Sequence, residues 1–106
     1  MSSIRRVIIN SSSTSVHVTA ELDITSNNNY VIYMTLYNMD GTEVKRGYQN
    51  FTEHYAPASR EYTLIPDYPL PSATQYEYAI QLSYRDTGEV IDRVTGYTAT
   101  SISHFE

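Results

Sequence analysis

Apolar and polar residues alternate along much of this chain. The clearest run spans residues 16–24, where every second position is apolar: Val16, Val18, Ala20, Leu22 and Ile24. Successive side chains of a β-strand point to opposite faces, so this period predicts a strand with one buried face. The same period recurs over residues 76–82, and no window shows a helical period of useful length. The pattern therefore predicts an all-β protein.

Residues typical of turns separate the runs. The expected strands are residues 4–9, 16–24, 30–37, 44–51, 60–65, 76–82 and 89–100. The Asn run at 27–29 predicts a loop, Asp40-Gly41 predicts a two-residue hairpin, and residues 86–88 predict a three-residue hairpin with Gly88 in the left-handed region. We expect one domain over residues 1–106, an antiparallel two-sheet sandwich of about seven strands. Its expected core includes Val18, Leu22, Ile32, Met34, Tyr76, Ile80 and Leu82.

The segment leading into residues 76–82 resembles the corner before the sixth strand of fibronectin type III domains. Leu70 lies six residues and Thr74 two residues before Tyr76, and Pro71 marks the turn. In such corners the Tyr hydroxyl bonds to the upstream backbone. The resemblance implies an immunoglobulin-like strand order, with Leu22 in the place of the family's usual Trp. It also implies that the loops after the second, fourth and sixth strands gather at one end.

Composition narrows the class further. The 106 residues include no Cys, so no disulfide or thiolate metal site can form. Seven basic and twelve acidic residues give a formal charge of −5, which disfavours nucleic acid or an anionic membrane as partner. The apolar run near the start, residues 7–9, is too short for a secretory signal. If the chain is complete, we expect a cytoplasmic protein.

Catalytic and metal-binding patterns are missing from the sequence. His17, His54 and His104 are far apart, and neither a Gly-x-Ser-x-Gly elbow nor paired zinc ligands occur. The turn carboxylates do not form an Asp-x-Asp-x-Asp-Gly calcium loop. We therefore expect a non-catalytic binding module without a metal or other cofactor.

Two binding functions fit these features. The first is a lectin-like module, because amide and carboxylate groups pair with sugar hydroxyls and an aromatic ring can stack on a sugar ring. Its predicted ligand-binding residues, all at the loop end described above, are Asn27, Asn28, Asn29, His54, Tyr55, Arg85, Asp86 and Glu89.

The alternative is a protein-interaction or homo-oligomerising module. The chain has eleven Tyr, and Tyr offers a large contact area with a polar tip. We expect Tyr33, Tyr37 and Tyr97 to lie on the face of the sheet formed by the third, fourth, sixth and seventh strands. Such residues often anchor protein interfaces.

Overall fold

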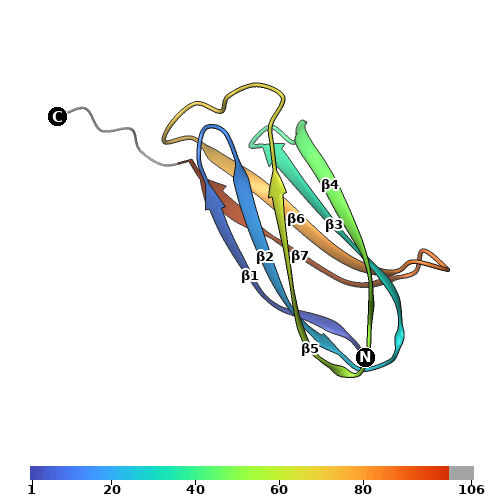
Figure 1. Ribbon diagram of the computed structural model, residues 1–106. Helices are drawn as coiled ribbons and strands as arrows, with labels where there is room; N and C mark the ends of the chain where they lie inside the picture. The colour runs from blue at the N-terminus through green and yellow to red at the C-terminus, as the bar shows by residue number, and fades with distance from the viewer. Residues whose placement is uncertain (101–106) are drawn as a thin grey trace.

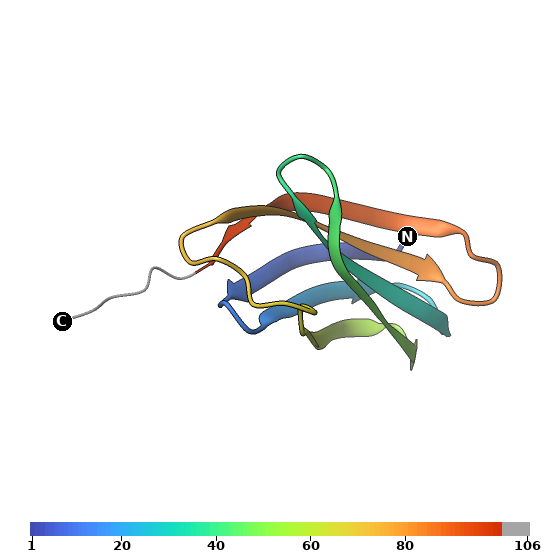
Figure 2. The ribbon, with the colours of Figure 1, turned by 90° about the horizontal axis from the view of Figure 1, so that it is seen from above.

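The computed structural model describes residues 1–100, which form two antiparallel sheets (Figure 1). The strands are β1 (Ser3–Ser11), β2 (Val16–Ile24), β3 (Asn28–Asn38), β4 (Glu43–Glu53), β5 (Ala56–Leu64), β6 (Gln75–Tyr84) and β7 (Val90–Ala99). One sheet has the order β1-β2-β5 and the other the order β4-β3-β6-β7. Seen from above, the sheets form two layers (Figure 2). The predicted all-β sandwich is confirmed, and so is the grouping of the third, fourth, sixth and seventh strands.

The core lies between the inner faces of the two sheets. All seven predicted core residues are buried. At its centre Ile32 of β3 stands opposite Leu82 of β6, and both side chains are completely shielded from solvent. Leu22 of β2 is equally buried. Among the described residues, no helix is long and apolar enough to cross a membrane.

Two predicted strand starts are wrong by two or more residues, and the strands predicted to end at residues 9, 51 and 82 run on to Ser11, Glu53 and Tyr84. Strand β3 already begins at Asn28, because Asn28 and Asn29 pair with Glu53 and Thr52 of β4. Backbone pairing with β4 outweighs the low strand preference of Asn. Strand β5 begins at Ala56 rather than at residue 60, and it contains Pro57. This Pro is tolerated because β5 lies at the edge of its sheet, where one row of backbone groups needs no strand partner.

The β3–β4 hairpin is longer than the predicted two-residue turn. Asn38 and Thr42 close it, with the Asn38 N–H donating to the Thr42 carbonyl at 2.8 Å. Gly41 has a φ of +91°, which a residue without Cβ adopts at little cost. The Asp40 carboxylate accepts hydrogen bonds from the backbone N–H and the hydroxyl of Thr42, and these hold the pKa of Asp40 below its usual value.

The β6–β7 hairpin has the predicted left-handed glycine but one more residue than predicted. Gly88 has a φ of +74°. The Tyr84 N–H donates to the Glu89 carbonyl at 2.9 Å, so the turn runs over residues 85–88. Glu89 therefore lies before β7, not within it.

Side-chain contacts join the edges of the two sheets. On one side the Ile4 N–H of β1 donates to the Asp92 carboxylate of β7 at 2.8 Å. On the other side the Tyr62 ring of β5 lies against β4 at Gly47, where a Cβ atom would come within 2.5 Å of the ring. A side chain at position 47 would displace this ring, so glycine permits the close approach.

The corner before β6 is held by a different residue from the one predicted. Tyr76 is buried, but within residues 1–100 its hydroxyl makes no hydrogen bond to the preceding loop. The Thr100 hydroxyl instead donates to the Pro71 carbonyl at 2.6 Å and accepts from the Thr74 N–H at 2.9 Å. A Tyr-to-backbone bond does occur at the opposite end, where the buried Tyr30 hydroxyl donates to the Ser26 carbonyl at 2.6 Å.

Truncating the central core pair should destabilise the fold strongly. We expect Leu82→Ala to lower the free energy of unfolding by ~2–5 kcal/mol, through lost apolar burial and the cavity left behind. Urea denaturation measures this. The exposed Ile65 is the control, and equal stability losses for Leu82→Ala and Ile65→Ala would contradict the assigned core.

The two buried tyrosines should respond differently to loss of the hydroxyl. Tyr30→Phe removes the bond to the Ser26 carbonyl and should cost ~0.5–1.5 kcal/mol of stability. Tyr76→Phe should cost less, because no corresponding bond is lost. If urea denaturation shows a larger loss of stability for Tyr76→Phe than for Tyr30→Phe, the Tyr76 hydroxyl does bond to the preceding loop, as the sequence predicted.

Candidate functional site

The loops that follow β2, β4 and β6 gather at one end of the sandwich, as predicted (Figure 1). The first two are joined where the Tyr55 N–H donates to the Asn27 side-chain oxygen at 3.0 Å. The β6–β7 hairpin is joined to β3 by the Arg85 N–H, which donates to the Asn29 carbonyl at 2.9 Å. The structure thus brings together Asn27 with Tyr55, and Asn29 with Arg85.

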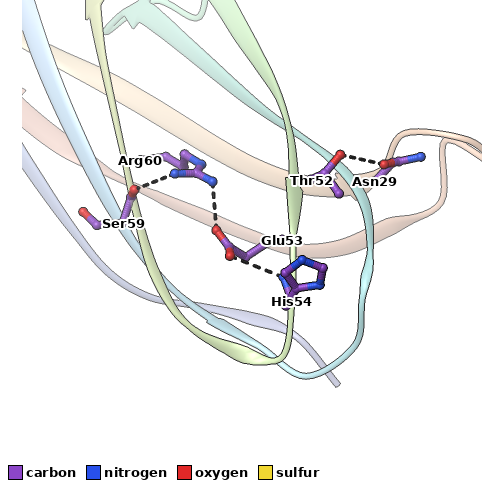
Figure 3. Close-up of polar contacts among 6 residues, drawn as sticks. All are labelled: Asn29, Thr52, Glu53, His54, Ser59 and Arg60. Atoms are coloured by element: carbon purple, nitrogen blue, oxygen red, sulfur yellow. Dashed lines mark hydrogen bonds and ion pairs between the residues drawn. The ribbon is translucent and has the colours of Figure 1, made fainter.

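Asn29 connects two further elements through its side chain. Its amide oxygen accepts from the Thr52 hydroxyl at 2.7 Å, and its amide nitrogen donates to the Asp86 carboxylate at 3.4 Å (Figure 3 shows the first bond). Both ends of this amide are therefore used inside the protein. Asn29 and Asp86 hold the hairpin in place, which leaves them less free for a ligand than the sequence indicates.

The remaining predicted residues make few contacts with this network. Asn28 accepts from the neighbouring Asn29 N–H, and the His54 backbone N–H donates to Glu53 (Figure 3). Within residues 1–100, the side chains of Arg85 and Glu89 make no hydrogen bond or ion pair with the remaining predicted residues. The loop end is thus two contact groups with exposed side chains around them.

Glu53, the last residue of β4, is held in an internal ion pair. Glu53 accepts from Arg60 at 2.9 Å (Figure 3). The Arg60 guanidinium also lies 4.6 Å from the centroid of the Phe51 ring. Residues 1–100 contain no group of three or more His, Asp or Glu placed to hold a metal ion. The contacts of Glu53 are those of a residue that fastens β4 to β5.

A concave surface lies elsewhere, on the outer face of the four-stranded sheet. Its volume is about 770 Å³. One row of side chains crosses all four strands, because the strand registers place Tyr48, Tyr33, Gln81 and Arg93 opposite one another in that order. We call this hollow the outer groove. Its lining includes the row of four together with Thr35, Tyr37, Arg46 and Ala79.

The outer groove combines aromatic rings with polar groups. Tyr33 and Tyr48 are 42% and 59% exposed, and their ring centroids are 6.2 Å apart with planes inclined at 44°. Thr35 and Ala79, in the next row, are small and leave room above the sheet. Arg46 is paired with Glu43, and that hydrogen bond raises the pKa of the Arg46 guanidinium. The groove therefore offers ring faces, hydroxyls, an amide and permanent positive charge.

The sequence predicted part of this surface. Tyr33 and Tyr37 line the outer groove, and Tyr97 is exposed on the same sheet. Tyr48, Gln81 and Arg93 were missed. The alternation within β4, β6 and β7 puts each of them on the outer face, but only the registers between strands show that they share one row.

Comparisons with known proteins identify the architecture. No family model matches the sequence, and neither does any curated protein. The fold is similar to parts of a glycosyl hydrolase family 2 member from Bacteroides cellulosilyticus (15% identity, 92% of this chain, 15% of that chain, TM-score 0.77) and of a Bacteroides uniformis β-glucuronidase (16%, 93%, 14%, 0.78). It is also similar to part of a putative β-galactosidase from Bacteroides fragilis (18%, 93%, 17%, 0.73).

These likenesses define a class of fold. The chain is an all-β sandwich domain like those found within glycosyl hydrolase family 2 structures. It spans about 15% of the length of the first of these enzymes.

The Asn29 network should support the β6–β7 hairpin. We expect Asn29→Ala to lower the free energy of unfolding by roughly 1 kcal/mol, because the bonds to Thr52 and Asp86 are lost. The Arg85 amide should also exchange its hydrogen faster. Asn28→Ala is the matched control and should have a smaller effect on both measurements. Equal effects of the two variants on hairpin exchange would show that Asn29 has no special role.

Proposed function

We propose that this chain is a non-catalytic accessory domain that binds carbohydrate in the outer groove. The observation that carries the proposal is the row in which two exposed tyrosines stand beside an amide and a guanidinium. Ligand sites combine apolar and aromatic walls with a few polar groups that fix orientation. A sugar ring matches this lining, since it has an apolar face for the ring of Tyr33 and hydroxyls for Gln81. One N–H of the Gln81 amide donates to the Ser83 hydroxyl at 3.2 Å, and its oxygen and second N–H remain for the sugar.

The structural neighbours support the same class of ligand. They are named glycosyl hydrolase, β-glucuronidase and β-galactosidase, all enzymes that act on sugars. This chain covers nearly all of its own length but only a small part of theirs. A sandwich of this kind can hold or position a saccharide while another part of a larger enzyme performs the chemistry. We propose this arrangement for the present chain.

The loop end is the second candidate for the sugar site. Tyr55 is 75% exposed there, and Asn28, His54, Arg85 and Glu89 are exposed as well. It ranks second because the amide of Asn29 and the side-chain oxygen of Asn27 already have internal partners. A ligand would have to replace those bonds, which reduces the net gain from binding.

A protein-binding or homo-oligomerising role is the alternative function. The observation that favours it is Tyr97, 61% exposed on β7 and on the same sheet as the outer groove. Exposed tyrosines spread over a sheet face suit a broad, flat partner. A sugar, in contrast, needs the concave part alone.

A glycan array followed by titration calorimetry of the best neutral hit tests the proposal. We expect Tyr33→Ala to weaken binding by at least about 1 kcal/mol, because the apolar sugar face loses its aromatic cover. Asp86→Ala should leave the affinity within error, because that side chain lies outside the outer groove. Tyr97→Ala is the control for the surrounding sheet face, and its affinity for the sugar should also be unchanged.

Two other results would contradict this assignment of the binding site. If Asp86→Ala loses affinity for the sugar and Tyr33→Ala keeps it, the loop end is the favoured site. A blank array, with Tyr97→Ala dissociating a dimer seen by light scattering, would replace carbohydrate binding with self-association.

A further inference from the structure

We propose that the outer groove selects a saccharide that carries a carboxylate, and that Arg93 is the residue that recognises this group. The inference rests on the proposed carbohydrate function and names the class of sugar for the same site. It follows from the charge, the pairing state and the spacing of the residues that line the groove.

The groove differs in charge from the chain as a whole. The formal charge of the chain is −5, with twelve acidic and seven basic residues. The lining of the outer groove nevertheless contains Arg46 and Arg93 and no Asp or Glu. A concave surface with one sign of charge concentrates ligands of the opposite sign. The favoured ligand is therefore an anion.

The two arginines are not equivalent. Arg46 is already bound to the Glu43 carboxylate, through a 2.9 Å hydrogen bond from its Nε. Arg93 is exposed, and within residues 1–100 its guanidinium has no hydrogen-bond or ion-pair partner. The adjacent carboxylate does not serve it, because Asp92 accepts from the backbone N–H groups of Ile4 and Arg93. Arg93 is thus the cation that is free to bind a ligand.

The spacing of the row suits a short stretch of saccharide. Gln81 stands between Tyr33 and Arg93, so the two outer positions are separated by two strand spacings, or roughly 10 Å. One sugar ring can then lie on Tyr33, with a hydroxyl at Gln81 and the carboxylate of the next sugar at Arg93. A guanidinium presents paired donors that match the two carboxylate oxygens, which a neutral hydroxyl does not offer.

The test compares acidic sugars with their neutral counterparts. The probes are tetramers of galacturonate and of glucuronate, each with its methyl ester, titrated into the whole chain by calorimetry. We expect the acid form of at least one tetramer to bind about tenfold or more tightly than its ester, as a charge-assisted hydrogen bond implies. Arg93→Gln should remove this preference and leave the acid and ester equal. Arg5→Gln, on β1 of the other sheet, should preserve it.

Each other outcome overturns the inference. If acid and ester bind alike, or only neutral glycans bind, the groove binds sugar without selecting a carboxylate. The proposed carbohydrate function is then retained and the inference about Arg93 is wrong. If the preference for acid survives Arg93→Gln, another residue provides the selection. If no acidic or neutral glycan binds, the inference and the proposed function fail together.

Discussion

The packing of Ile32 against Leu82 fixes the register of the two central strands, β3 and β6, and the outer face depends on that register. Both side chains are fully buried and directly opposite each other. A slip of one residue would turn every core side chain toward solvent, so this pairing is strongly specified. With the inner face fixed, Tyr33 and Gln81 must point outward side by side. The core therefore places the residues that we assign to the binding site.

Most of the fold could be predicted from the sequence because one physical rule governs it. The alternation that buries Val18 and Leu22 also identifies β2 to the residue, at Val16–Ile24. Local turn chemistry was less reliable. Gly41 and Gly88 adopt positive φ, as their turns require, but both hairpins are longer than predicted. The boundary at Asn28 failed because backbone pairing with β4, a contact distant in sequence, outweighed the local preference of asparagine.

The candidate site was harder to predict because it depends on contacts between strands. Strand order correctly brought Asn27 near Tyr55 and Asn29 near Asp86, but it did not reveal that their polar groups bind one another. The outer groove requires three registers at once to align Tyr48 with Arg93. A single sequence specifies the faces of its strands, whereas the alignment of those faces emerges from packing. The similarity to sandwich domains of glycosyl hydrolases concerns the overall fold and does not extend to this alignment of side chains.

The most direct test of the account is a map of backbone amide chemical shifts during titration with a bound oligosaccharide. We predict that the largest changes fall on the middle of β3 and β6, at Tyr33, Thr35 and Gln81, and extend to Arg93 on β7. Changes confined to Asn27, Tyr55 and the residue 85–88 hairpin would contradict the assignment of the outer groove and place the ligand at the loop end instead.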